Sequence, residues 1–120
     1  MAGRLTTHVL DIAQGRPAAG MTVELWRLDT ERETRALLRT TRTNADGRTA
    51  APMLADAEMA AGVYELVFAV GDYFRAQRIP AAEPPFLDRV PVRFGIADPA
   101  VHYHVPLLTS PWAYSTYRGS

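Results

Sequence analysis

The sequence predicts an all-β protein, an antiparallel β-sandwich of seven to eight short strands with one short helix. Apolar and polar residues alternate with a period of two along much of the chain, which places successive side chains on opposite faces of a strand. Clusters of Gly, Pro, Asn and Asp interrupt this alternation at short intervals, as turns between antiparallel strands do. A chain of 120 residues fits one domain, which we place at residues 1–120.

The first half of the chain supplies four expected strands, which are residues 5–12, 22–28, 35–44 and, as a short strand, 48–51. In the second of these, Val23 and Leu25 fall on one face and are expected to point inward. A Gln-Gly-Arg-Pro turn follows the first strand, and an Asn-Ala-Asp-Gly turn follows the third. The Asp46-Gly47 pair fixes the start of the short strand.

The second half supplies four more, which are residues 64–70, 89–96, 101–108 and, as a short strand, 114–117. The alternation is clearest in 89–96, where Val90, Val92, Phe94 and Ile96 share one face. Pro91 has no backbone N–H to donate to a neighbouring strand, so we expect this strand at an edge of its sheet or bulged there.

Two segments lack the alternation and favour a helix. Residues 54–61 are rich in alanine and stop at Gly62. Residues 72–77 are expected to form a short helix that is capped by Asp72 and ends before Pro80.

The charge balance excludes some classes of partner. The chain has 13 basic and 13 acidic residues, a formal net charge of zero, with 48% apolar and 22% charged residues. Because nucleic acids and anionic membranes attract strongly basic surfaces, we expect neither as a partner.

The residue types that are missing exclude some kinds of chemistry. The chain contains no cysteine, so thiol nucleophiles, thiolate metal sites and disulfides are impossible. Every basic residue is an arginine, so a lysine Schiff base or lysine general base is excluded too. The first eight residues contain no long apolar run, and no stretch approaches the ~18 apolar residues of a membrane span. We therefore expect a cytoplasmic protein.

The three histidines, His8, His102 and His104, are candidate functional residues. His102 and His104 are two apart on an expected strand, so they share a face. One interpretation is a three-histidine zinc site with an open position for water. The other is acid–base chemistry without a metal, because the pKa of histidine, about 6.5, allows it to take a proton from water and return one. A buried structural histidine is the ordinary alternative to both.

Arg48 and the C-terminal residues are further candidates. Arg48 directly follows the Asp46-Gly47 turn, which fixes the direction of its side chain, and a guanidinium suits a substrate rich in carbonyl oxygens. The end of the chain carries Trp112, Tyr114 and Tyr117 before its last arginine. Loose termini are polar and poor in aromatic residues, so we expect this tail to fold into a site.

Four segments together resemble the 5-hydroxyisourate hydrolases, the transthyretin-related enzymes of urate breakdown. They are residues 5–11 (LTTHVLD), 43–48 (TNADGR), 102–108 (HYHVPLL) and 114–120 (YSTYRGS). The resemblance spans the whole chain, and the Tyr-Arg-Gly-Ser tail is its most specific part. It implies a transthyretin-like sandwich of two four-stranded sheets, and a homotetramer, built as a dimer of dimers, with active sites in the channel between dimers.

The resemblance also implies the site. Its catalytic positions fall on His8, Arg48 and His104, while His102 has no usual catalytic assignment. The substrate-binding positions fall on the tail residues Tyr117, Arg118, Gly119 and Ser120. No metal and no cofactor are implied.

The implied reaction is the hydrolysis of a small molecule, 5-hydroxyisourate, in purine degradation. Opening its cyclic amide bond gives 2-oxo-4-hydroxy-4-carboxy-5-ureidoimidazoline. We expect His104, with His8, to activate water and Arg48 to stabilise the oxyanion. The order of the two histidines stays open at this stage, because coupled groups titrate as a pair.

Three other functions compete with this one. A transthyretin-like carrier of hydrophobic ligands predicts apolar groups at the three catalytic positions. A zinc hydrolase would use all three histidines. A structural sandwich module of a larger assembly would need none of them.

Overall fold

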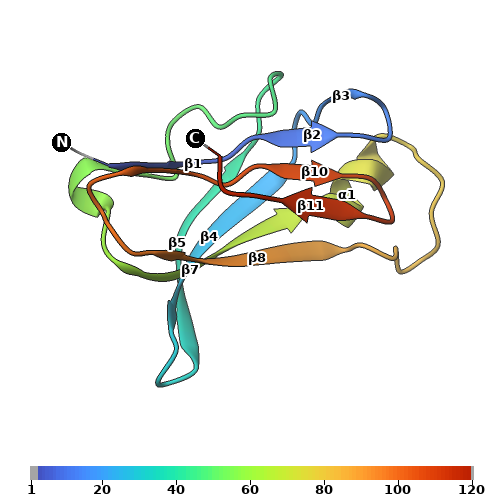
Figure 1. The fold of residues 1–120 in the computed structure, drawn as a ribbon. Helices are drawn as coiled ribbons and strands as arrows, with labels where there is room; N and C mark the ends of the chain where they lie inside the picture. The colour runs from blue at the N-terminus through green and yellow to red at the C-terminus, as the bar shows by residue number, and fades with distance from the viewer. Residues whose placement is uncertain (1–2, 120) are drawn as a thin grey trace.

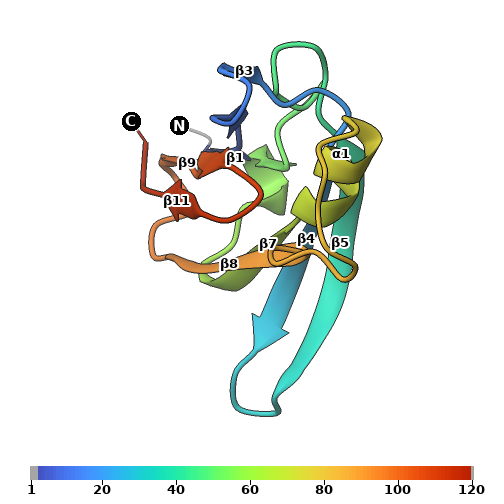
Figure 2. The ribbon, with the colours of Figure 1, turned by 90° about the vertical axis from the view of Figure 1, so that its right-hand side faces the viewer.

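The computed structural model describes residues 3–119, which form a sandwich of two layers (Figure 1). The first layer is one antiparallel sheet of four strands in the order β5-β4-β7-β8. Its strands are β4 (Thr22–Asp29), β5 (Thr34–Arg42), β7 (Gly62–Ala69) and β8 (Arg89–Ile96). In Figure 2 the hairpin of β4 and β5 extends well beyond the rest of the sandwich.

The second layer consists of two small sheets that follow one another end to end. The first has the order β6-β1-β9, with β1 (Arg4–Thr6), β6 (Leu54–Ala55) and β9 (His102–His104). The other has the order β11-β10-β2-β3, with β2 (Val9–Asp11), β3 (Arg16–Pro17), β10 (Leu107–Thr109) and β11 (Tyr114–Thr116). β1 pairs with β9, and β2 with β10, in parallel.

The two small sheets replace two longer strands that the sequence predicts, residues 5–12 and 101–108. The first breaks at Thr7, whose buried hydroxyl turns inward and donates to the carbonyl of Val105 over 2.7 Å. The second breaks at Pro106, which cannot donate to a ladder. The backbone bridges the gap, because the amide of Val105 donates to the Thr6 carbonyl and that of Leu107 to the His8 carbonyl, each over 2.9 Å. His8 therefore lies at a break in the layer.

The core between the layers confirms the predicted inward faces. Val23 and Leu25, which were expected to point inward, have no exposed surface, and the same is true of Leu66 and Phe68 on β7. On β8, Val90, Val92 and Ile96 are buried, and Phe94 packs against the core. β8 is an edge strand and Pro91 is exposed on it, as the missing N–H requires. The all-β sandwich with one short helix is thus confirmed.

The local predictions for helices need correction. α1 spans Val70–Ala76, and its N-cap is Ala69. Asp72 lies in the first turn of α1 and accepts a hydrogen bond from Arg75 over 2.7 Å, so it is not the cap. In place of a helix over 54–61 the chain forms β6 and a short 3₁₀ turn, η1 (Asp56–Glu58). Asp56 has a φ of 54°, which is incompatible with a continuous right-handed helix.

The strand predicted at residues 48–51 is also wrong. Arg48 makes a single antiparallel bridge with His8, and the following residues run as a loop to β6. Within the part of the chain that the structure describes, no helix is long and apolar enough to cross a membrane.

Candidate active site

A polar pocket of about 420 Å³ opens where β1 and β9 lie side by side. Its volume falls in the range of small-molecule sites. Arg48, His102 and His104 line it, so three of the candidate residues from the sequence meet here. The other lining residues come from β1, from the break after it and from the loop before β6, and they are Arg4, Thr6, Thr7, Thr49, Ala50, Ala51 and Pro52.

The parallel register of β1 and β9 sets the floor of the pocket. Arg4 is paired with His102, and Thr6 with His104, so their side chains share one face of the sheet. The Thr6 hydroxyl oxygen lies 2.7 Å from His102 Nε2 and 2.8 Å from His104 Nδ1. One hydroxyl thus contacts both imidazoles, whose ring centroids are 6.1 Å apart.

His8 lies beside the pocket at the break between β1 and β2. Its backbone bridges to Arg48, and its Nε2 lies 2.8 Å from the carbonyl oxygen of Asp46. A carbonyl oxygen only accepts, so His8 carries its proton on Nε2. This hydrogen bond fixes the ring against the turn that presents Arg48.

The turn before Arg48 is shaped by two residues of the Asn-Ala-Asp-Gly segment. The side-chain oxygen of Asn44 accepts hydrogen bonds from the amides of Asp46, over 2.9 Å, and Arg48, over 3.2 Å. Gly47 has a φ of 75°, and a Cβ there would stand 2.3 Å from the carbonyl oxygen of Val9. Only glycine allows this close approach. The turn therefore holds the start of the Arg48 side chain beside His8.

The C-terminal tail returns along β9. The Thr116 hydroxyl donates to the Pro106 carbonyl over 2.7 Å, after which Gly119 bridges to His104. The Gly119 amide donates to the His104 carbonyl over 2.8 Å. The tail is thus folded against a candidate catalytic residue.

The predicted tail residues do not all lie at the pocket. The Arg118 guanidinium stacks over the ring of Tyr103 at 4.3 Å. Tyr103 lies between the two histidines of β9 and points into the core, so Arg118 lies on the opposite side of the strand from the imidazoles. Tyr117 is 59% exposed, and Ser120 lies outside the described residues.

The electrostatic surroundings favour neutral histidines. Burial lowers the pKa of His104 below its usual value, and the positive charge of Arg48 lowers it further, with smaller contributions from His102 and His8. Burial and the charge of Arg4 lower the pKa of His102 in the same direction. Since a general base needs a free lone pair, these shifts keep both rings in the reactive form near neutral pH.

The geometry bears on the two competing chemical interpretations. Among residues 3–119, no group of three or more His, Asp or Glu side chains is placed so that it could hold a metal ion. The pocket is also lined by arginines and imidazoles rather than by the apolar groups that a carrier of hydrophobic ligands needs.

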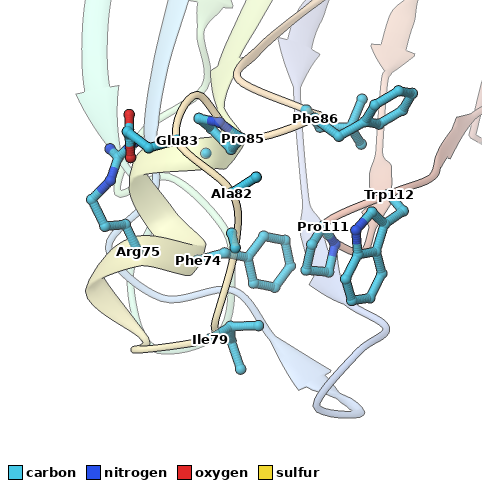
Figure 3. Close-up of a pocket in the computed structure, with 12 residues that line it drawn as sticks. Phe74, Arg75, Ile79, Ala82, Glu83, Pro85, Phe86, Pro111 and Trp112 are labelled. Carbon is cyan, nitrogen blue, oxygen red and sulfur yellow. The ribbon is translucent and has the colours of Figure 1, made fainter.

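A second pocket, of about 150 Å³, lies between α1, the loop after it and the turn before β11 (Figure 3). Phe74, Ile79, Phe86, Pro111 and Trp112 make it largely apolar. Its charged groups, Arg75 and Glu83, form an ion pair of 3.1 Å with each other. This pocket contains no histidine, and its side chains suit no acid–base role.

Sequence reasoning missed Arg4 and Thr6 as pocket residues. The period-two pattern places Thr6 on the same face as His8, but it carries no information on the partner strand. The parallel pairing with β9 is what brings Thr6 to the histidines.

The two-layer β-sandwich is the fold of transthyretin-type domains, which match nearly the whole chain. The chain belongs to the HIUase/Transthyretin family, whose sequence pattern matches residues 5–119. It is 64% identical to a 5-hydroxyisourate hydrolase of Mesorhizobium japonicum over 98% of this chain and 93% of that protein.

Solved structures agree with this assignment. An (S)-allantoin synthase matches with a TM-score of 0.92 and 48% identity over 98% of this chain and 44% of its own. Sea bream transthyretin in complex with thyroxine matches with a TM-score of 0.84 but only 26% identity, over 97% and 94%. The fold is therefore shared by an enzyme and by a protein solved in complex with thyroxine.

Proposed function

We propose that the chain is a hydrolase that opens 5-hydroxyisourate at its cyclic amide C–N bond and yields 2-oxo-4-hydroxy-4-carboxy-5-ureidoimidazoline. The observation that carries this proposal is a polar pocket in which Arg48 stands beside the weakly basic imidazole of His104. The high identity to a 5-hydroxyisourate hydrolase supports the choice of substrate.

Each group has a task that its position supports. His104, with His8 beside it, takes a proton from a water molecule, and the resulting hydroxide attacks the ring carbonyl. The Arg48 guanidinium binds the carbonyl oxygens and stabilises the negative charge of the tetrahedral intermediate. The proton held by the histidines passes to the leaving nitrogen as the C–N bond breaks. The chemistry is complete with water as co-substrate, so we propose that no cofactor takes part.

The tail forms a wall of the site in this proposal. Gly119 lies against His104, and Tyr117, Arg118 and Ser120 are proposed to contact the substrate or order the wall. Arg118 does the latter through its stacking on Tyr103.

We further propose a homotetramer, a dimer of dimers, that works in the cytoplasm. The pocket of one chain is open to solvent, whereas hydrolytic sites gain from excluding bulk water. Large exposed apolar side chains, which include Trp112 and Tyr114, are available for contacts between copies. Sedimentation would test this assembly, and a stable, active monomer would contradict it.

The experiment for the activity uses freshly made 5-hydroxyisourate, whose decay is followed by ultraviolet absorbance. We expect the wild type to accelerate the decay, and His104→Asn and Arg48→Ala to reduce kcat/KM by about 100-fold or more. Near-normal turnover in both variants would contradict the assignment of roles. A carrier would not accelerate the decay at all, and full activity after treatment with a chelator would rule out a zinc hydrolase.

A further inference from the structure

The Thr6 hydroxyl makes two short contacts with imidazole nitrogens, His102 Nε2 at 2.7 Å and His104 Nδ1 at 2.8 Å. A hydroxyl has one hydrogen and two lone pairs, so it donates to one of these nitrogens at most. At least one imidazole must therefore donate its own N–H to Thr6. The proton positions of the two rings are coupled through a single side chain.

Three arrangements of neutral rings satisfy both hydrogen bonds. In the first, Thr6 donates to His104 Nδ1, so the proton of His104 is on Nε2. In the second, Thr6 donates to His102 Nε2 and accepts from His104 Nδ1–H, so the lone pair of His104 is on Nε2. In the third, both rings donate to the Thr6 oxygen, and the lone pair of His104 is again on Nε2. Within residues 3–119 the His104 side chain forms its hydrogen bond through Nδ1, so its Nε2 is available. The second and third arrangements let Nε2 take a proton from water, and they also suit the imidazolium that forms, since Nδ1–H continues to donate. Of these two, only the second also gives the Thr6 hydrogen an imidazole acceptor.

We propose that Thr6 and His102 are positioning residues that hold His104 in the tautomer with Nδ1–H and a free Nε2 lone pair. This inference rests on the proposed hydrolase function, and it gives a task to the histidine that the sequence leaves without one. Thr6 suits the task because its β-branched side chain has few χ1 rotamers, and the parallel pairing of β1 with β9 places it between the rings.

The arrangement makes the base sensitive to protonation of His102. A protonated His102 donates from Nε2, and the hydroxyl hydrogen must then turn away from it. Turned toward His104 Nδ1, it forces the proton of His104 onto Nε2 and removes the base. The charged and titratable groups that face this pair are Arg4 from β1, Arg48 from the loop, and His8. All of them oppose protonation, and none of the described residues that line the pocket is a carboxylate.

The first experiment reads the tautomers of the wild-type protein directly. Two-bond ¹H–¹⁵N correlation spectra at pH 8 should show His104 with a protonated Nδ1 and a bare Nε2, and His102 with a bare Nε2. A His104 proton on Nε2 would overturn the proposal, whatever the activity. Because this readout needs no turnover, it also separates the proposal from the proposed function, which fails if the wild type does not hydrolyse 5-hydroxyisourate.

The second experiment removes the hydroxyl and keeps the side-chain shape. We expect Thr6→Val to lower kcat by about 10- to 100-fold with KM changed by less than about threefold, because the base is lost and not the binding groups. Thr6→Ser should restore most of kcat and the wild-type tautomer. Thr40→Val makes the same chemical change at an exposed position of β5 and should behave as wild type. A Thr6→Val enzyme with full kcat would overturn the proposal.

The third experiment tests His102. His102→Gln keeps a hydrogen-bond acceptor that does not titrate, so we expect kcat near that of the wild type. The acid limb of its kcat–pH profile should report the binding of one proton, to His104, rather than of two. His102→Leu removes the acceptor and should lower kcat as Thr6→Val does. Equal kcat and equal acid limbs in the wild type and both variants would show that His102 has no part in positioning. His102 is only partly buried, so we expect both His102 variants to fold. They therefore still test the proposal if Thr6→Val fails to fold.

Discussion

Gly119 lies directly against the imidazole of His104. A Cβ at residue 119 would stand 2.6 Å from His104 Cδ2 and 3.2 Å from both Cβ and Cγ of the same residue. Real Cβ atoms do not approach so closely, so the tail passes over the ring only because residue 119 is a glycine. The glycine is thus a steric requirement of the site.

We expect Gly119→Ala to lower kcat/KM by about tenfold or more, because either His104 or the tail must move. Gly95→Ala is the matched control, since a Cβ on Gly95 meets no atom within 4 Å. Circular dichroism should show both variants folded.

Deletion of residues 117–120 should abolish turnover and leave the sandwich folded. A truncated protein with the wild-type rate would show that the tail has no part in catalysis.

Loss of Arg48 should raise the pKa of His104. The guanidinium disfavours the imidazolium, so removing it lets His104 bind a proton at higher pH. Because protonated His104 is not a base, the acid limb of kcat/KM should move to higher pH in Arg48→Ala. Histidine titration by NMR measures the same shift without turnover. Arg32→Ala, at an exposed end of the β4–β5 hairpin, should leave it unchanged. An unchanged His104 pKa in Arg48→Ala would contradict the electrostatic coupling.

The turn that presents Arg48 can be tested at Gly47. Alanine with positive φ costs about 1–2 kcal/mol of folding free energy. Gly47→Ala adds a collision with the Val9 carbonyl, at 2.3 Å, whereas Gly20→Ala has a similar φ and meets only the end of the Arg42 side chain, at 3.5 Å. We therefore expect a larger drop in the urea midpoint for Gly47→Ala, with lower kcat/KM. If both variants lower the urea midpoint equally and reduce kcat/KM equally, the position of Arg48 does not depend on this turn.

A buried hydrogen bond between Tyr73 and Asp11 predicts how stability changes at high pH. The Tyr73 hydroxyl donates to the Asp11 carboxylate over 2.8 Å, and burial, followed by this carboxylate, raises the pKa of Tyr73 to about 12 from its usual 10.0. Between these values the unfolded chain releases the proton and the folded chain keeps it, so the free energy of unfolding falls as pH rises. Urea denaturation from pH 8 to 11.5 measures this slope.

Tyr73→Phe is the variant for comparison. Below pH 10 it should cost about 1–3 kcal/mol, since the carboxylate loses one donor and keeps those from Ala13 and Gln14. Above pH 10 its slope should be shallower than that of the wild type. Parallel slopes in the two proteins would mean that Tyr73 does not cause the loss.

The sequence predicted the parts of the fold that depend on side-chain periodicity. Strand β8 has the predicted bounds, and its edge position follows from Pro91. Periodicity did not predict the breaks at Thr7 and Pro106, because it carries no information on bonds between neighbouring segments of a layer, such as that from the Thr7 hydroxyl to the Val105 carbonyl. The helix expected over 54–61 failed for a similar reason. Alanine content favours a helix, but the backbone of Asp56 does not adopt one.

The candidate site was predicted in part. His104 and Arg48 line one pocket, and Gly119 reaches His104, whereas Arg118 stacks on Tyr103 instead of facing the imidazoles. Arg118 points away from the imidazoles because the next residue, Gly119, is the one that bridges to His104. The sequence of the tail has no periodicity that would predict this bridge. Thr6 was missed because its importance depends on a parallel partner about one hundred residues away in the sequence.

The parallel pairing of β1 with β9 also has a consequence for protein synthesis. The four-stranded sheet is complete at residue 96, before the ribosome has made either histidine of β9. A nascent chain that has reached the end of β8 therefore holds Thr6 but neither of the imidazoles that contact it. A chain that stopped after β8 would keep His8 and Arg48 and lack the base of the proposed mechanism, His104. The hydrogen bonds that Thr6 makes to the two imidazoles can thus form only after residue 104 has been made.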